Sequence, residues 1–329
     1  MKSLFKKPIG FSLVVKNVDQ DVRTWADVYG IGPWKIFNYD TNNVAELLVD
    51  EKQANECALV AVCDIGGREV KLIQPTTGDS VFARFLDRHG EGIFSVTYEP
   101  TDYDETLSYI KQKGDKFLIQ GSINGKDFCL IDSYKDAWHY IEFGRTPLEY
   151  PSERMYPVDG NAPDTPPLFT GIFQIAFAIT DMESAVKKMA DNYGLGPFEC
   201  CNLSEDVLDD RIADGKPAQY TLQCGMAHYD DLEFELISPL PDKDPTLYNS
   251  FLAEHGDGLN HIGYSVSDYQ KTVDFLASDR GCEVLLQGKV CKLHTYIYLD
   301  TTADIKNIVE LNLTIQPPKI PPFLVYPEK

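Results

Sequence analysis

Gly30-Ile31-Gly32-Pro33-Trp34 recurs as Gly194-Leu195-Gly196-Pro197-Phe198, shifted by 164 residues along the chain. Two further stretches recur with almost the same shift. His89-Gly90-Glu91-Gly92 returns as His255-Gly256-Asp257-Gly258, and Tyr140-Ile141-Glu142 returns as Ile308-Val309-Glu310. Because the shift changes by only a few residues, we interpret the pattern as a duplication with small insertions. The two halves can therefore be compared position by position.

The length and the charge of the chain limit its architecture and its partners. Its 329 residues are enough for two domains of roughly 150 residues, each with its own core. It carries 30 basic and 51 acidic residues, a formal net charge of −21. Phosphate backbones and anionic bilayers repel such a chain, so we expect neither a nucleic-acid nor a membrane partner. The oligomeric state cannot be read from the sequence.

The N-terminal stretch and the cysteines indicate a cytoplasmic protein. Lysines followed by apolar residues up to Val15 could suggest a signal peptide, but Gly10 to Val18 aligns with the interior stretch Gln174 to Met182. No apolar run approaches the roughly 20 residues of a membrane span. The 8 cysteines contain no CxxC pair, which predicts reduced thiols.

Proline-rich segments set the predicted domain boundaries. Residues 146–168 hold six prolines among Asp, Asn and Gly residues, a composition typical of a linker. We therefore predict a first domain over 1–145, a linker over 146–168 and a second domain over 169–316. The tail, 317–329, is also rich in proline and is expected to be extended.

Hydrophobic periodicity divides each half into two similar modules. Residues 173–180 alternate as a half-buried strand does, and Asp181 is placed to cap a helix that ends at Gly194. Extended segments follow at 219–227 and 232–238, and a second unit of the same kind begins at His261. The first half repeats this order from Gly10 and from Ser95. The predicted fold is α+β, with four βαβββ modules that form two domains.

These motifs, in this order, resemble the vicinal oxygen chelate superfamily. Its members include glyoxalase I, methylmalonyl-CoA epimerase, extradiol dioxygenases and bleomycin-resistance proteins. The resemblance rests on the Gly-x-Gly-Pro-aromatic turn, the strand from Phe234 to Pro239 and the stretch from Gly258 to His261, and it covers nearly the whole chain. It implies that each pair of modules forms a curved mixed-sheet cup with helices outside.

In this superfamily, four positions in a cup hold one divalent metal ion. Carried onto the second half, the resemblance implies the ligands Gln174, Glu235, His261 and Glu310. The strand pattern agrees, because Gln174 and His261 each share a strand face with small residues, which leaves room for a metal ion and a substrate. Each of these residues alone would as readily be structural; the set of four favours a metal site.

The equivalent positions in the first half are Gly10, Lys71, Ser95 and Glu142. An ammonium at a ligand position repels a metal ion, and two of the positions offer no strong donor. We therefore expect the first cup to lack metal and its Lys71 and Glu142 to be able to form an ion pair. Its role is either structural or the binding of an organic ligand without metal. The Glu in both copies also leaves open a packing role for this position.

The implied ligand set favours proton-transfer chemistry. Three oxygens and one nitrogen suit Zn, Mn, Co or Ni better than the iron of ring-cleaving dioxygenases, which use two His and one carboxylate. The resemblance implies an isomerase, an epimerase or a glyoxalase-type lyase acting on a small molecule with adjacent oxygens. Glu310 and Glu235 are the candidate acid and base.

Two other functions stay open at this stage, namely an Fe(II)-dependent ring-cleaving or keto-acid dioxygenase and a non-catalytic small-molecule-binding protein. The sequence does not identify the substrate. The basic residues predicted near the second cup show no phosphate-binding arrangement; they are Arg211, Lys216, Lys289 and Lys292. The acidic segment Cys200 to Lys216 is predicted to be a loop over the cup mouth, which argues against a polyanionic substrate.

Overall fold

The computed structural model describes residues 3–78, 80–157, 167–241 and 243–328. The chain divides into two compact units at Leu168/Phe169, except that residues 304–306 group with the N-terminal unit. Each unit contains one 11-stranded sheet. Residues 158–166 of the predicted linker and residue 329 of the predicted tail lie outside the described residues. The described part of 146–168 includes a short strand, β11, over Arg154–Tyr156.

The N-terminal unit contains strands β1 to β11 and four α-helices in its described residues. Their bounds are β1 Phe5–Val14, α1 Val18–Arg23 continued by a π-helical segment η1 Thr24–Val28, β2 Trp34–Asp40, β3 Ala45–Val49, β4 Lys52–Gln53, β5 Glu56–Ile65, β6 Arg68–Pro75, α2 Val81–His89, β7 Gly92–Pro100, α3 Tyr103–Lys113, β8 Phe117–Ile123, β9 Lys126–Ile131, α4 Tyr134–Ala137 and β10 Tyr140–Gly144.

The C-terminal unit repeats this order of elements. Their bounds are β12 Gly171–Ala178, α5 Met182–Tyr193, β13 Phe198–Leu203, β14 Leu208–Ala213, β15 Lys216–Pro217, β16 Leu222–Tyr229, β17 Leu232–Pro239, α6 Leu247–His255, β18 Gly258–Ser265, α7 Tyr269–Asp274 continued by a π-helical segment η2 Phe275–Asp279, β19 Val284–Val290, β20 His294–Leu299, α8 Thr302–Ile305, β21 Ile308–Thr314 and β22 Leu324–Tyr326.

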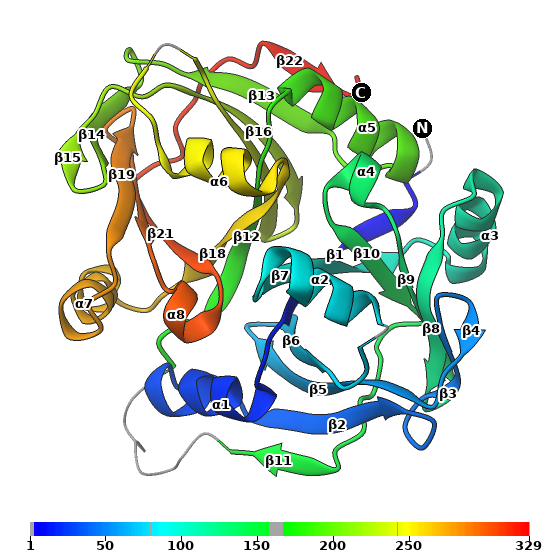
Figure 1. Cartoon of the computed structure of the whole chain (residues 1–329). Coiled ribbons are helices and arrows are strands. Elements are labelled where there is room, and N and C mark those ends of the chain that lie inside the picture. The colour runs from blue at the N-terminus through cyan, green and yellow to red at the C-terminus, as the bar shows by residue number, and fades with distance from the viewer. Residues whose placement is uncertain (1–2, 79, 158–166, 242, 329) are drawn as a thin grey trace. The chain divides into compact units, whose positions relative to one another are not determined.

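Both sheets are mixed and strongly curved, and they share the same central strand order (Figure 1). The centre of the N-terminal sheet is β6-β1-β7-β10, and the centre of the C-terminal sheet is β17-β12-β18-β21. In each centre the first strands of the two modules pair antiparallel, and each of them pairs parallel with the last strand of its own module. This pairing confirms the predicted arrangement of βαβββ modules in two domains.

Local sequence signals explain the elements beside β12. The side chain of Asp181 accepts a hydrogen bond from the backbone of Ser184 and begins α5, as its position predicts. Gly194 ends the helix with a φ of 67°, a left-handed conformation that favours glycine. A Cβ on Gly196 would lie 3.0 Å from the ring of Phe198. Only a glycine at this position of the turn therefore lets the Phe198 ring pack so close to the backbone.

Helices lie on both faces of the C-terminal sheet. A Cβ on Gly225 of β16 would lie 2.8 Å from Sδ of Met182, which places α5 against the outer, convex face. Helix α6 lies on the concave side (Figure 1), where Leu247 and Tyr248 join a buried cluster with Ile237 and Leu286. The expectation that helices lie outside the cup therefore holds for the module helix α5, while the connecting helix α6 fills one end of the cup.

The acidic segment 200–216 is not the predicted loop. It continues β13, forms β14 and reaches β15, and β14 pairs antiparallel with β19. The prediction failed because the polar residues of a strand near the end of a sheet resemble those of a loop. In the tail, β22 pairs with β13.

Candidate metal centre

Strand pairing brings the four predicted ligands to one region of the concave face. Glu235 of β17 and His261 of β18 both lie opposite Ala176 of β12. Gly263 of β18 lies opposite both Gln174 and Glu310. Because directly paired residues point to the same side of a sheet, all four side chains share one face.

Three of the four offer ligand atoms within 4.8 Å of one another, namely Glu235, His261 and Glu310. The Nε2 atom of His261 lies 2.9 Å from Oε2 of Glu310 and 3.7 Å from Oε2 of Glu235. All three residues are buried, with His261 fully inaccessible. Two carboxylates and an imidazole thus converge in a poorly solvated place, where uncompensated negative charge is costly.

Asn260 orients the imidazole of His261. Its Oδ1 atom lies 2.9 Å from Nδ1 of His261, so Nδ1–H donates to the amide oxygen and Nε2 faces the carboxylates. The ring edge of His261 also packs against Tyr298, with ring centroids 4.7 Å apart. A ligating histidine is commonly held in this way, with its second nitrogen fixed by a neighbouring oxygen.

The carboxylates and the imidazole alter one another's protonation. Burial raises the pKa of Glu310, although the hydrogen bond from His261 opposes this effect. Burial lowers the pKa of His261, but the hydrogen bond with Glu310 and the nearby carboxylate of Glu235 outweigh it and raise that pKa overall. Without a cation, the site therefore relies on the imidazole proton to offset the charge of the carboxylates.

Two buried oxygens in the cluster have no hydrogen-bond partner among the described residues. They are Oε1 of Gln174 and Oε2 of Glu235. Leaving a buried acceptor unsatisfied costs about 1–3 kcal/mol, more for a charged group. A divalent cation would satisfy both atoms, and three oxygens with one nitrogen form a donor set that suits it. The residues present therefore fit a metal ion.

The structure adds Glu233 to the rim of this cluster. It pairs with Gln174 across β12 and β17, two residues before Glu235 on the same strand face. Burial, together with the charges of Glu235 and Glu310, raises the pKa of Glu233 to about 7, while a hydrogen bond with Gln174 opposes the rise. His228 lies 3.3 Å from its carboxylate. The period-2 pattern of the strand could have identified Glu233.

Cys224 also contacts the cluster. Its thiol donates a hydrogen bond of 3.2 Å to Oε1 of Glu235, so it is more than the small core residue that its position in β16 suggests. The basic residues predicted near the cup have local partners. Lys289 lies 2.7 Å from Asp210, and Arg211 donates to the backbone oxygen of Tyr220 at 2.7 Å.

The N-terminal cup has the same register and a different set of side chains. Ser12 lies opposite both Lys71 and Ser95, and Glu142 lies opposite Thr97. The pairing thus confirms the equivalence of Lys71 with Glu235, of Ser95 with His261 and of Glu142 with Glu310.

The predicted ion pair of Lys71 is confirmed. The fully buried ammonium contacts Glu142 directly and lies 3.1 Å from Glu69. Burial lowers the pKa of Lys71, but the two carboxylates outweigh it and raise that pKa overall. A Cβ on Gly10 would lie 2.1 Å from the backbone oxygen of Glu69, which explains why no ligand stands there. The cation in this cup is thus the ammonium group of the Lys71 side chain.

Comparison with known proteins supports the assignment of the fold. A mutant of 4-hydroxymandelate synthase from Streptomyces coelicolor is 13% identical over 97% of this chain and 95% of that chain, with a TM-score of 0.65. A xylose isomerase-like TIM barrel/4-hydroxyphenylpyruvate dioxygenase fusion protein is 11% identical over 97% of this chain and 50% of that chain, with a TM-score of 0.52. At these identities the likeness shows a shared fold.

Other matches are shorter. A methylmalonyl-CoA epimerase in complex with methylmalonyl-CoA and NH4+ is 22% identical over 45% of this chain and 100% of that chain, with a TM-score of 0.33. Among curated proteins, none matches the chain by sequence. The sequence model of the glyoxalase/bleomycin resistance protein/dioxygenase superfamily matches residues 11–130 and 173–298, one range in each unit. The chain belongs to this superfamily.

Proposed function

We propose that the C-terminal cup binds one divalent metal ion and catalyses proton transfer next to a carbonyl group. The proposed ligands are Gln174, Glu235, His261 and Glu310. The observation that carries this proposal is the convergence of two buried carboxylates and an imidazole nitrogen within 4.8 Å. The unsatisfied oxygens of Gln174 and Glu235 support it, because a bound cation would remove their desolvation cost.

The donor set favours Zn, Mn, Co or Ni. When bound, such an ion supplies Lewis-acid polarisation to a substrate that presents adjacent oxygens. In the sheet order, β17 and β21 lie on opposite sides of the pair β12 and β18, so Glu235 and Glu310 flank the space above that pair. One carboxylate accepts the proton from the carbon next to the carbonyl, and the other returns a proton. The net reaction is an isomerisation, an epimerisation or a glyoxalase-type lyase reaction.

The surroundings of the cup favour a small substrate without a polyanionic part. Lys289 and Arg211 already have local partners, as described above. The formal net charge of −21 disfavours nucleic acid and anionic membrane surfaces. None of the helices in the described ranges is long and apolar enough to cross a membrane, and all eight cysteines are free thiols. Free thiols are compatible with the cytoplasm, which we propose as the location.

A ring-cleaving or keto-acid dioxygenase is the second candidate. The observation in its favour is the likeness in fold to 4-hydroxymandelate synthase along both units. Against it stands the donor set, because such iron sites use two histidines and one carboxylate, whereas this cup offers one histidine with Gln174 and Glu235. A non-catalytic binding protein is the third alternative, and it predicts no tightly bound metal.

Solvent-deuterium exchange separates these functions. The protein, purified without chelators, would be incubated in D2O with a panel of small 2-oxo and 2-hydroxycarbonyl compounds and followed by NMR, with oxygen uptake measured in parallel. We expect deuterium to enter next to the carbonyl of at least one compound, without oxygen consumption. Iron-dependent oxygen uptake without exchange would instead support the dioxygenase. A protein without bound metal and without either activity would contradict both catalytic functions.

A further inference from the structure

Two cysteines lie directly opposite each other beside the proposed metal site. Cys201 of β13 pairs with Cys224 of β16 in the antiparallel ladder. Directly opposed residues of an antiparallel ladder carry their side chains on the same face of the sheet, so the two thiols lie next to each other. Cys224 in turn donates to Oε1 of Glu235. The thiol of Cys224 thus lies between the thiol of Cys201 and the carboxylate of Glu235.

The two thiols face the cup, and only one of them is accessible. The neighbouring Cys200 points to the other face, since a Cβ on Gly225 would lie 3.1 Å from its sulfur. Because successive residues of a strand point to opposite faces, Cys201 lies on the concave side. Cys201 is partly exposed, whereas Cys224 is only 5% exposed. A small oxidant can therefore reach Cys201 first.

We propose that Cys201 and Cys224 form a reversible disulfide in response to hydrogen peroxide, and that this disulfide weakens the adjacent metal site. The second part of the proposal rests on the metal site proposed above. Directly opposed residues of an antiparallel pair have Cα atoms about 4.5–5.5 Å apart. A disulfide requires about 4.4–6.8 Å, so the Cα separation of a directly opposed pair lies within the range that a disulfide bridges.

Hydrogen peroxide is the only oxidant that this reaction needs. Peroxide oxidises the sulfur of Cys201 to a sulfenic acid and leaves as one water molecule. The sulfur of Cys224 then attacks that sulfur, the S–S bond forms, and the sulfenic oxygen leaves as a second water molecule with the remaining protons. The two thiols together lose two electrons and two protons, and a dithiol reductant restores them by thiol–disulfide exchange.

Oxidation changes a contact of the proposed ligand Glu235. In the disulfide, Cys224 no longer carries the hydrogen that it donates to Oε1 of Glu235. The other carboxylate oxygen, Oε2, already has no hydrogen-bond partner among the residues that the structure describes. Loss of such a supporting hydrogen bond typically weakens metal binding about 10–100-fold. We expect an effect near the lower end of this range, because Cys224 is a weak donor.

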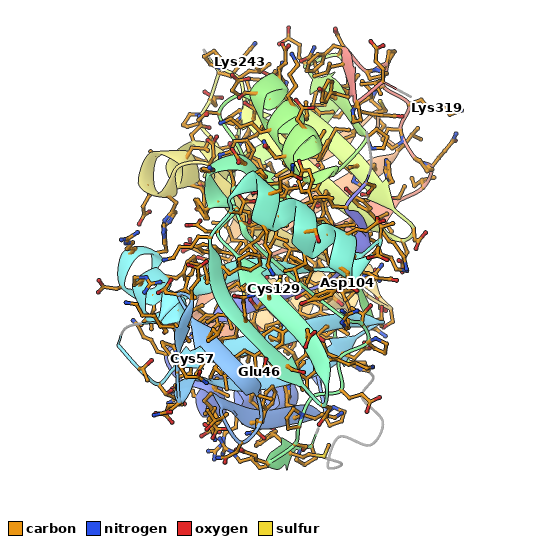
Figure 2. All side chains as sticks on the ribbon, turned by 90° about the vertical axis from the view of Figure 1, so that its right-hand side faces the viewer. Glu46, Cys57, Asp104, Cys129, Lys243 and Lys319 are labelled. Carbon is orange, nitrogen blue, oxygen red and sulfur yellow. The ribbon has the colours of Figure 1, made fainter. Side chains whose placement is uncertain are left out.

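Peptide mapping tests the disulfide directly. The folded protein would be treated with hydrogen peroxide, alkylated and digested, and the cross-linked peptides identified by mass spectrometry. We expect a peptide pair that joins Cys201 to Cys224 and disappears after treatment with dithiothreitol. The N-terminal thiols Cys57 and Cys129, labelled in Figure 2, are buried and should stay reduced. If the folded protein gives no Cys201–Cys224 cross-link, the proposal of this disulfide is wrong.

Zinc competition with a chromophoric chelator tests whether the disulfide weakens the metal site. We expect the dissociation constant for Zn²⁺ to rise about 10-fold on oxidation and to return on reduction. The Cys201→Ser variant should bind Zn²⁺ as the reduced wild type does and should not respond to peroxide, whereas Cys200→Ser should keep the full response. If the disulfide forms and the affinity for zinc does not change, the proposed effect of the disulfide on the metal site is wrong. If the reduced wild type binds no zinc, the proposed metal site fails and the proposed effect of the disulfide on it fails as well, while the cross-link still tests the disulfide.

Discussion

The two cups of this chain share one strand register and differ in where their positive charge comes from. In the N-terminal cup, Lys71 places an ammonium between Glu69 and Glu142. In the C-terminal cup, the same position is Glu235, and it faces His261 and Glu310. Lys71 thus supplies a cation in the N-terminal cup, whereas Glu235 at the same position of the C-terminal cup adds a second carboxylate that faces the imidazole of His261. The duplication retained the fold in both halves, and we propose metal binding in one of them.

The largest expected difference between the cups is in catalysis. We expect Glu310→Gln to reduce deuterium exchange by about 10²–10⁴-fold, because the amide can no longer accept the substrate proton. The matched change in the other cup, Glu142→Gln, should leave the exchange rate within a factor of about two, because the proposed chemistry lies in the C-terminal cup. Rates would be measured by NMR in D2O. Equal losses in both variants would contradict the assignment of the chemistry to one cup.

The second difference concerns stability, and the two cups should respond with opposite signs. Lys71→Met leaves Glu142 and Glu69 without their cation, and removal of one partner of a buried ion pair costs about 3–5 kcal/mol. Glu235→Met removes a buried carboxylate oxygen without a hydrogen bond, so the metal-free C-terminal unit should gain about 1 kcal/mol. Urea unfolding of metal-free protein, followed separately for each unit, measures both changes. If both variants lower the free energy of unfolding, the proposed difference in charge between the two cups is wrong.

A third difference appears at the late strand of each cup. Nε2 of His139 accepts a 2.8 Å hydrogen bond from the hydroxyl of Tyr98, because its Nδ1–H donates to the backbone oxygen of Ala137. The equivalent pair in the second half is Tyr264 and Asn307. Burial lowers the pKa of His139 from its usual value of 6.5 to about 4. The stability that neutral His139 contributes is therefore fully present above pH 6.5 and is lost as the pH falls towards 4.

We expect this loss to reach about 2–3 kcal/mol in the N-terminal unit. His139→Asn, which copies the residue of the other half, should flatten the pH dependence between pH 6.5 and 4. The melting temperature of the N-terminal unit at a series of pH values is the measurement. An unchanged slope in the variant would show that other groups cause the acid sensitivity.

Much of the fold followed from the sequence because the repeat aligned the signals of both halves. The alternation around Gln174 and His261 identified the concave face. The assignment of Lys71 and Glu142 to two of the four ligand positions of the first cup anticipated their ion pair. Local periodicity is a reliable signal where one strand face is buried. The strands β14 and β22 were missed, because they depend on pairing with residues far along the chain.

The surroundings of the site were harder to predict than its four candidate ligands. Glu233 shares the parity of Glu235, but only the pairing with Gln174 shows that it borders the cluster. The proximity of Cys201, Cys224 and Glu235 depends on the order of β13, β16 and β17 in the sheet. Strand order is set by tertiary packing and connection lengths, and a single sequence contains little direct information on it.

The metal content of the purified protein tests the central claim most directly. Wild-type protein and the variants His261→Ala and Ser95→Ala, which change equivalent positions in the two cups, would be purified without chelators and analysed by elemental mass spectrometry. We predict about one divalent ion per chain in the wild type and in Ser95→Ala, and less than about a tenth of that in His261→Ala. Unchanged metal content in His261→Ala, or no metal in the wild type, would contradict the account.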